Sequence, residues 1–503
     1  MRRFTTLLAF GLLWLGALAQ TPIAAWQFFG NAAPNNPATP GLGKKTIYYP
    51  CLTRLYAVNV EDGTLKWQYP ADAPLDATIL GQPVEGENLV YFGASNGNVY
   101  ALDIETGAVR WIFRARSAPT ARFVLDEDIL YLGTGGGEVY AINARNGEPV
   151  WSAPYRTDDY ITGSLVKVED TLYFGTNGGF IHAITASGGR RRWVYRLPAP
   201  NYDPQPVYAN NSIYATSSDQ LLALNPNSGA LRWRRQFTTE IRLAPAANED
   251  YVVVTTRENR VLVYDHNGRL IAGSDRAPIT LRYEPLFPPV IHEGDLWVVT
   301  RRGTLLRYSL PEGQLKWLYT LRPPEGTLDA NNRRIAYLAI TSRLLFIPNG
   351  LVVATAEGNL TAFLYNWVDR TPPQVVRTLP NVGEMMSGQL PLDFFARIRD
   401  DGSGVNPGSV QFLLDDEPLE AEYDPSLGEV TVRLRSGGTV QPLADGRHTL
   451  TVIASDWAGN TVRYTWAIHV DNSLRRAPTR PQQQQQPTGP GTGGRGGRGG
   501  GDI

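Results

Sequence analysis

The stretch that decides the fold is Val99–Trp111, with the sequence VYALDIETGAVRW. Its first five residues have the alternating pattern of a half-buried strand. The Asp-x-x-Thr-Gly segment that follows has hairpin-turn chemistry, and a second strand carries Trp111 four residues after Gly107. The stretch is therefore predicted to form two antiparallel strands joined by a tight turn.

The same spacing from glycine to tryptophan recurs along the chain. The further copies are Gly63/Trp67, Gly147/Trp151, Gly189/Trp193, Gly229/Trp233 and Gly313/Trp317. Trp233 and Trp317 lie 84 residues apart, which is two periods of about 42, so a degenerate copy lies between them. There Gly268 keeps the turn, and Ala272 stands where the tryptophan is expected. The chain is predicted to be a repeat protein.

Each copy contains a partner strand, marked by an apolar pair that alanine usually follows. These pairs are Leu55-Tyr56, Val99-Tyr100, Val139-Tyr140, Ile181-His182, Leu221-Leu222, Val261-Leu262, Leu305-Leu306 and Leu360-Thr361. Two more strand-like runs precede each pair, which gives four strands per unit and predicts an all-β propeller. Eight blades are expected, with seven as the alternative should the sixth unit prove irregular.

The final unit lacks its own tryptophan strand, because the chain runs into Thr371-Pro372-Pro373 after the last partner strand. A strand of the missing type, Ala25–Phe29 with Trp26, stands near the N-terminus without the strands that should precede it. We expect it to complete the last blade, since closing the ring leaves no long unpaired sheet edge.

Tyr91–Trp111 and Tyr131–Trp151 show the pattern Tyr-x-Gly-x-x-x-Gly-x-Val-Tyr-Ala, followed by the turn and the tryptophan. This pattern resembles the pyrroloquinoline-quinone-type repeat over about residues 20–370. The family includes quinone-dependent dehydrogenases and non-enzymatic members such as the lipoprotein that assists outer-membrane barrel assembly. The resemblance implies an eight-bladed propeller in which tryptophans dock neighbouring blades, here Trp26, Trp67, Trp111, Trp151, Trp193, Trp233 and Trp317.

The chemistry of the dehydrogenases is not expected in this chain. In those enzymes the quinone lies between a tryptophan and a disulfide of adjacent cysteines, beside a calcium or similar ion. This chain has one cysteine, Cys51, and shows no clear cluster of acids and amides to hold the ion. Its five histidines have no metal-ligand spacing. We therefore predict no catalytic residue and no cofactor. Binding of pyrroloquinoline quinone is not expected, because the single cysteine cannot form the disulfide.

The first nineteen residues read as a signal peptide. Arg2 and Arg3 precede an apolar run too short to span a bilayer, and Ala17-Leu18-Ala19 is a small-x-small cleavage pattern. Export to the periplasm or the cell surface is predicted, with no transmembrane segment in the mature chain. Cys51 is far from the cleavage point, so a lipoprotein is not expected.

The amino-acid composition changes at Thr371, where a segment begins whose strand-like runs are spaced differently from those of the repeats. The runs PLADGRHTL (Pro442–Leu450) and ASDWAGN (Ala454–Asn460) resemble those of bacterial immunoglobulin-like domains. The resemblance covers about residues 371–472 and implies a small β-sandwich. Asp400, Asp401 and Asp456 are candidate calcium ligands at one end of it, although turn capping explains the same residues more simply. Residues 473–503, with Gln482–Gln486 and the Gly-Arg repeats around Arg495 and Arg498, are predicted to be disordered.

Charge gives little guide to a partner. The 47 Lys and Arg residues nearly balance the 48 Asp and Glu residues, so no global field favours nucleic acid. Arg190-Arg191-Arg192, Arg234-Arg235 and Arg301-Arg302 are interpreted as solvated strand ends, with a basic patch as the alternative. The leading hypothesis is a monomeric, exported, non-catalytic scaffold that contacts envelope proteins or polysaccharide. A quinone-dependent dehydrogenase or degenerate relative, and a carbohydrate-binding or adhesive surface protein, are the alternatives.

Overall fold

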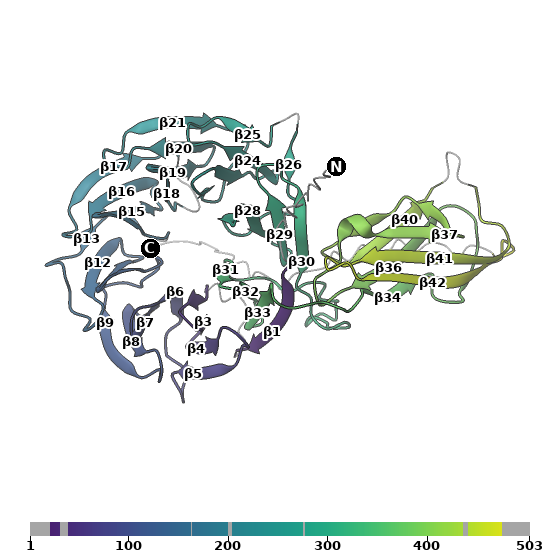
Figure 1. The fold of residues 1–503 in the computed structure, drawn as a ribbon, viewed down its shortest axis with the longest axis horizontal. Coiled ribbons are helices and arrows are strands. Elements are labelled where there is room, and N and C mark those ends of the chain that lie inside the picture. The colour runs from purple at the N-terminus through teal and green to yellow at the C-terminus, as the bar shows by residue number, and fades with distance from the viewer. Residues whose placement is uncertain are drawn as a thin grey trace, which may run out of the picture.

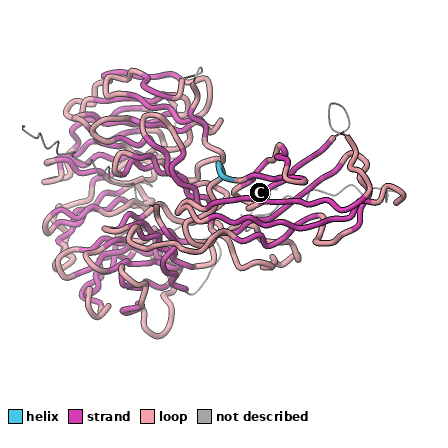
Figure 2. The backbone as a smooth tube through the Cα atoms, turned by 45° about the vertical axis from the view of Figure 1, so that its right-hand side comes forward, coloured by secondary structure: helices cyan, strands magenta, loops and turns pink. Residues whose placement is uncertain are grey.

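The computed structural model describes residues 21–30, 39–161, 163–199, 204–274, 277–435 and 441–474. The predicted signal peptide at 1–19 and the predicted tail from residue 475 onward lie outside these ranges. Within them the fold is all-β, and the single helical element is a short 3-10 helix, η1 (Pro407–Ser409), cyan in Figure 2.

The strands of the described residues before 370 form eight antiparallel sheets arranged as a ring (Figure 1). The first four sheets are β2 (Gly41–Leu42), β3 (Thr46–Cys51), β4 (Arg54–Asn59) and β5 (Leu65–Tyr69); β6 (Ile79–Glu85), β7 (Leu89–Ala94), β8 (Asn98–Asp103) and β9 (Val109–Arg114); β10 (Val124–Asp126), β11 (Ile129–Gly133), β12 (Glu138–Asn143) and β13 (Tyr155–Arg156); and β14 (Val166–Val168), β15 (Thr171–Thr176), β16 (Phe180–Thr185) and β17 (Arg191–Arg196).

The second half of the ring repeats this order, with one irregular sheet and one closing sheet. These sheets are β18 (Val207–Ala209), β19 (Ser212–Ser217), β20 (Gln220–Leu224) and β21 (Leu231–Gln236); β22 (Ala246–Ala247), β23 (Val252–Thr255), β24 (Arg260–Tyr264), β25 (Leu270–Ala272) and β26 (Ile279–Thr280); β27 (Val290–His292), β28 (Asp295–Val299), β29 (Thr304–Ser309) and β30 (Leu315–Thr320); and β31 (Leu345–Ile347), β32 (Gly350–Ala354), β33 (Asn359–Leu364) and β1 (Ile23–Phe29).

The N-terminal strand β1 closes the ring by pairing antiparallel with β33, more than 300 residues later in the chain. Trp26 lies opposite Ala362 in that ladder. The same tryptophan-to-alanine register joins Trp67 to Ala57 and Trp111 to Ala101 inside continuous blades. The closure predicted from the orphan strand at Trp26 is therefore present, and β1 occupies the position of a normal fourth strand.

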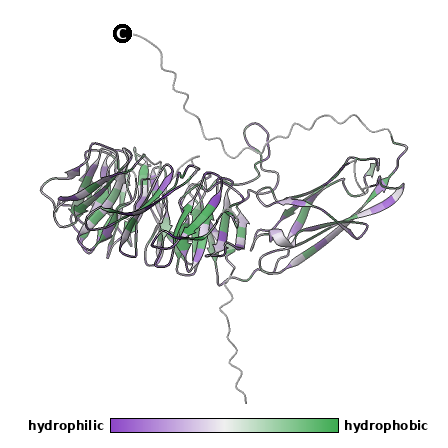
Figure 3. Cartoon of the chain, turned by 90° about the horizontal axis from the view of Figure 1, so that it is seen from above, coloured by the Kyte–Doolittle hydropathy of each residue, from purple (hydrophilic) through white to green (hydrophobic). Residues whose placement is uncertain are grey.

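The hydrophobic core is distributed between blades rather than within one centre. One cluster, for example, joins Tyr48, Leu55 and Trp67 of the first blade to Ile79 and Phe92 of the second. Further clusters of the same kind follow around the ring. Seen from above, the propeller is a flat disc that the second domain extends sideways (Figure 3). Each blade therefore depends on its neighbours for burial of its apolar faces.

The repeat tryptophans dock each blade onto the turn of the next. Trp67 Nε1 donates to the Ile104 carbonyl at 2.8 Å, and a Cβ on Gly107 would lie 2.7 Å from the Trp67 ring. The other contacts of this kind run from Trp111 to Ala144, Trp151 to Ala186, Trp193 to Pro226 and Trp233 to His266. The turn must be glycine because the indole lies on its Cα, and because its φ is positive.

The sixth blade replaces the missing tryptophan with an aliphatic side chain. Ala272 ends the short strand β25, and the chain returns to the sheet as β26, which pairs with β24. Ile279 of β26 lies on the turn of the next blade, where a Cβ on Gly313 would be 2.6 Å from it. The fourth strand is thus split in two, and the isoleucine fills the place of an indole.

We expect Gly189→Ala to destabilise the protein by about 3 kcal/mol, because the methyl group would lie 2.8 Å from the Trp151 ring at a φ of +63°. Gly188→Ala is the adjacent control, since the nearest atom to its new Cβ is 3.9 Å away. Urea unfolding of both variants measures the difference. Equal midpoints would show that the indole does not constrain the turn.

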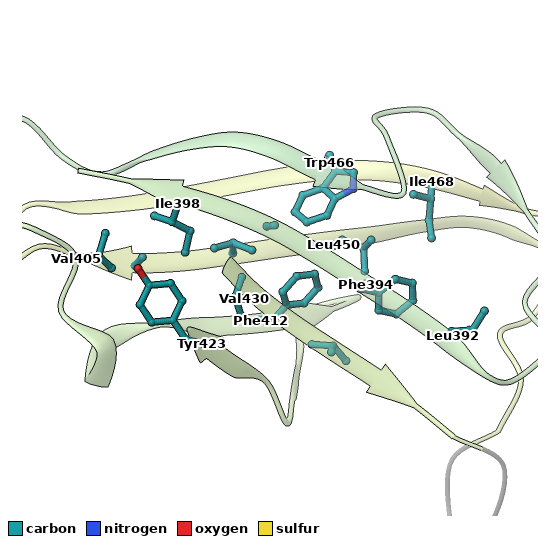
Figure 4. Packing of buried hydrophobic residues seen from close by; sticks show 14 of the residues in the cluster. Leu392, Phe394, Ile398, Val405, Phe412, Tyr423, Val430, Leu450, Trp466 and Ile468 are labelled. Atoms are coloured by element: carbon teal, nitrogen blue, oxygen red, sulfur yellow. The ribbon is translucent and has the colours of Figure 1, made fainter. Parts of the chain in front are cut away.

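The second domain contains two sheets that face each other. They are β34 (Gln374–Leu379), β36 (Leu392–Arg399), β40 (Glu429–Leu434) and β39 (Glu422–Asp424), and β35 (Met385–Met386), β42 (Thr461–Val470), β41 (Gly446–Ser455), β37 (Gln411–Leu414) and β38 (Glu417–Leu419). Figure 4 shows Phe394 and Phe412 packed together between them, beside Trp466 and Ile468. The immunoglobulin-like resemblance stays a prediction, whereas the two-sheet sandwich is observed.

Candidate functional site

The sandwich docks against the seventh blade of the propeller, and this junction contains a group of buried polar residues that includes Arg397, Asp400 and Asp456. Trp317 Nε1 donates to the Ser403 carbonyl at 3.0 Å, and Tyr319 Oη donates to the Asp401 carbonyl at 3.2 Å. In blades one to five the tryptophan finds its acceptor on the turn of the next blade. Here a loop of the sandwich supplies it.

Trp457 is the main apolar contact of the junction. Its side chain packs against two inter-blade clusters, and its Nε1 donates to the Leu318 carbonyl at 3.1 Å. The strand β1 joins the same junction, because the Ala24 amide donates to the Gly402 carbonyl at 3.1 Å. The ring closure and the sandwich are therefore held by one set of contacts.

An ion-pair network secures the opposite side of the junction. Arg397, which is buried, pairs with Glu429 of the sandwich at 2.9 Å and with Glu325 of the propeller at 2.5 Å. Arg334 of the propeller reaches Glu429 at 3.1 Å. Tyr283 Oη donates to Asp424 at 2.6 Å beside this network. Buried ion pairs of this kind fix the orientation of the sandwich on the propeller, since a buried charge that loses its partner raises the free energy of the folded state.

Two of the three predicted calcium candidates come together at this junction, and the third does not. Carboxylate oxygens of Asp400, Asp456 and Asp369 all lie within 4.8 Å of one another. The structure does not bring Asp401 into this group, because its exposed carboxylate pairs with Arg399 at 2.7 Å. Asp400 is buried and Asp401 follows it, so the chain turns the two side chains in different directions.

Most oxygens of the cluster are already used by local hydrogen bonds. Asp400 Oδ1 accepts from the amides of Gly402 and Gly404, at 3.2 and 2.6 Å. Both oxygens of Asp456 accept from Asn460, and Asp369 accepts from the Ser403 amide at 2.7 Å. This is the pattern of loop capping by aspartate. It holds the loop that carries the Trp317 acceptor.

Burial, and then the charges of Asp369 and Asp456, raise the pKa of Asp400 to about 7, against opposing hydrogen bonds from Gly404 and Gly402. Burial likewise raises the pKa of Asp456. The folded protein therefore binds a proton at Asp400 that the unfolded chain releases above pH 4. This group stabilises the fold most at low pH, and its contribution is lost as the pH rises through about 7.

The unfolding free energy, measured in EDTA, should be lower at pH 8 than at pH 5.5. Asp400→Asn should reduce this loss by about 2 kcal/mol, because the pKa of about 7 lies about 1.5 units above the lower pH. Asp62→Asn is the control, since the pKa of Asp62 is lowered and not raised. Calcium should leave the melting temperature at pH 8 unchanged. A calcium-dependent rise that Asp400→Asn removes would instead make the cluster a metal site.

A second polar group lies between residues of opposite sides of the ring. Arg343, which precedes β31, donates to Gln205 Oε1 at 2.9 Å, and Gln205, which precedes β18, also accepts from Ser164 at 3.3 Å. These residues belong to the eighth, fifth and fourth blades, so the contact spans the ring. Arg122 lies near this group. Its pKa is lowered by burial and then by the charge of Arg343, while part of the Arg122 side chain stays exposed to water.

His182, in the tyrosine position of the repeat, is a packed sheet residue. It stacks on Phe174 with ring centroids 5.1 Å apart and lies 3.2 Å from Tyr155 Oη. Burial lowers its pKa to about 4, so it is neutral at physiological pH. Cys51 is buried in β3 and is the single cysteine of the sequence, so the chain forms no internal disulfide.

The junction was largely missed by sequence reasoning. Asp369 was overlooked because it precedes the Pro372-Pro373 boundary and belongs to neither repeat pattern. Trp457 stands directly after Asp456 and could have been noticed as an aromatic on a turn. The partners of Arg397 are Glu325 and Glu429, which lie 72 and 32 residues away. No local pattern reveals such a network.

Comparisons with known proteins agree with the ring. The family model described as "Outer membrane protein assembly factor BamB" matches residues 25–216 and 177–367. A relative with that name from Nitrosomonas eutropha is 27% identical over 152 residues, which is 30% of this chain and 35% of the relative. The match therefore spans about a third of that curated relative's length.

Solved structures share the fold at low identity. BamB from Moraxella catarrhalis has a TM-score of 0.54 at 18% identity and covers 68% of this chain and 100% of its own. The computationally designed Ika8 protein gives 0.51 at 14%, with 69% and 99% covered, and a europium-containing methanol dehydrogenase gives 0.51 at 14%, with 66% and 84% covered. Within the described ranges, no helix has the length and hydrophobicity needed to cross a bilayer.

Proposed function

Because the chain belongs to the BamB family of outer membrane protein assembly factors, we propose that it is an exported, non-catalytic scaffold that binds proteins during assembly of the cell envelope. The observation that carries the proposal is the family match, which takes in nearly the whole ring from residue 25 to residue 367. The propeller supplies a stiff platform, and the sandwich fixed to its edge extends that platform.

Two features support binding rather than quinone chemistry. The chain has one cysteine, buried in β3, so the disulfide of adjacent cysteines on which the quinone rests cannot form. The Arg343 and Gln205 side chains, from the eighth and fifth blades, also meet at 2.9 Å across the ring. The likeness to methanol dehydrogenase concerns the fold alone.

Export and the absence of a lipid anchor are parts of the same proposal. The charged and apolar pattern of residues 1–19 supports export. Cys51 is buried inside the first blade, which supports a mature protein without lipid on that cysteine. Fractionation of native cells and mass measurement of the mature N-terminus test both points, and a lipid-modified mass would contradict the second.

The experiment that tests the function removes the protein from its native host and quantifies folded outer-membrane proteins. Their amounts should fall and recover on complementation with the wild type. Unchanged amounts would overturn the assembly role. Dye reduction by the purified protein with added pyrroloquinoline quinone and calcium would overturn the non-catalytic part. Specific binding on a glycan array would favour the adhesive alternative.

A further inference from the structure

The outer edge of blades four to six carries a group of arginines that we call the arginine rim: Arg190, Arg191, Arg196, Arg234 and Arg269. All are exposed. They lie on or beside the outermost strands β17, β21 and β25, which follow one another along the circumference of the ring (Figure 1). Trp193 Nε1 donates to the Pro226 carbonyl at 2.7 Å, which holds β17 against the blade of β21.

Five blades, the first, second, fourth, fifth and seventh, carry one cation with a structural role. It stands directly before the repeat tryptophan and has a partner on its own blade. Arg110 pairs with Asp103 at 2.7 Å, Arg192 with Asp170 at 3.0 Å and Lys316 with Asp295 at 2.6 Å. Arg232 donates to the Ser212 hydroxyl and Lys66 to the Thr46 hydroxyl, both at 2.7 to 2.8 Å. Where an outer strand carries a cation for its own blade, a single one at this position is enough.

The arginine rim exceeds that need. None of its members has a carboxylate partner among the described residues. In the described parts of 186–242 there are eight arginines against two acids, Asp219 and Glu240, and Glu240 is already paired with Arg242 and Arg257. Uncompensated like charges repel one another and add nothing to the fold. Their concentration on one sector is explained by a ligand of opposite charge.

Apolar side chains alternate with the arginine rim. Val194, Leu231, Leu270 and Ile271 are each more than a third exposed and stand on the same three strands. Arginine mixed with exposed apolar residues is typical of surfaces that bind proteins. A site for a bare polyanion has no use for the apolar part, and β17 and β21 also offer unpaired sheet edges.

We propose that the arginine rim docks an acidic, partly apolar surface of a protein partner, with carboxylates facing Arg190, Arg191 and Arg234 and apolar side chains meeting Leu231 and Ile271. The inference rests on the proposed scaffold function and names the chemistry of its partner. Electrostatic complementarity of this kind sets partner choice and association rate, and it weakens with salt.

The test uses two peptide probes of equal charge, polyglutamate and a peptide of alternating glutamate and valine, with binding measured at low and high salt. The wild type should bind the alternating peptide more tightly. R190Q/R191Q/R234Q should bind it about tenfold more weakly. R145Q/R435Q/R463Q is the matched control, because it removes the same charge from exposed arginines that each pair with an acid, and it should bind like the wild type.

Leu231→Ser with Ile271→Ser should abolish the preference for the alternating peptide. Equal binding by the wild type and the rim variant, with both melting normally, would overturn the proposal. Tighter binding of heparin or of phosphatidylglycerol vesicles through the same arginines would also overturn it, in favour of a polymer or a membrane. A further measurement separates this failure from failure of the scaffold function. Outer-membrane proteins are quantified in cells that carry only the rim variant, and normal amounts there would mean that the scaffold function holds without the arginine rim.

Discussion

Deletion of β1, residues 23–29, is expected to lower the melting temperature by about 10 °C or more, the equivalent of several kcal/mol for a domain of this size. The strand supplies the fourth position of the last blade, where Trp26 lies on the turn at Gly63 and Ile23 is buried. Without it, β33 becomes an exposed edge, and the sandwich loop loses the amide of Ala24.

Thermal melting followed by circular dichroism measures this effect. Phe29→Ala is the control, because that side chain is two-thirds exposed and should leave the curve unchanged. A synthetic peptide of residues 21–30 should restore much of the lost stability when added to the deletion variant. A deletion variant that melts like the wild type would show that the ring does not depend on its N-terminal strand.

Trp457→Ala is expected to uncouple the sandwich from the propeller. The indole packs on two inter-blade clusters and donates to the Leu318 carbonyl at 3.1 Å, so its removal should cost about 3 to 5 kcal/mol at the junction. The sandwich core around Phe412 and Trp466 does not include this residue and should stay intact.

Calorimetry distinguishes coupled from independent domains. The wild type should unfold in one transition, whereas Trp457→Ala should show two. Trp367→Ala is the control, since that indole is about half exposed and lies outside the buried clusters. Two transitions already present in the wild type would mean that the junction does not couple the domains.

The ring could be predicted from sequence because its decisive interactions are local and repeated. The four-residue spacing from Gly107 to Trp111 indicates a hairpin. The recurrence of that spacing reflects the contact of each indole with the turn of the next blade, as Trp67 shows with Ile104. Even the closure was visible, because the final unit lacks a strand of the type found at Trp26. These features need no knowledge of distant residues.

The junction could not be predicted in the same way. Its members come from separate parts of the chain, and each has a bland local explanation. Asp400 reads as a turn cap, and only the folded chain brings Asp369 beside it. The sixth blade shows the same limit: Ala272 marks the missing tryptophan, but the replacement by Ile279 depends on a second strand that no repeat pattern indicates.

The pairing of β1 with β33 also sets an order of events during synthesis and export. β1 is made early, and its partner β33 is made more than 300 residues later. The ring therefore cannot close until almost the entire propeller has been made. Until then Trp26 and Phe28 stand on an unpaired strand of the kind that joins other chains. A chain released before residue 364 is therefore expected to keep an open ring with an unpaired strand edge.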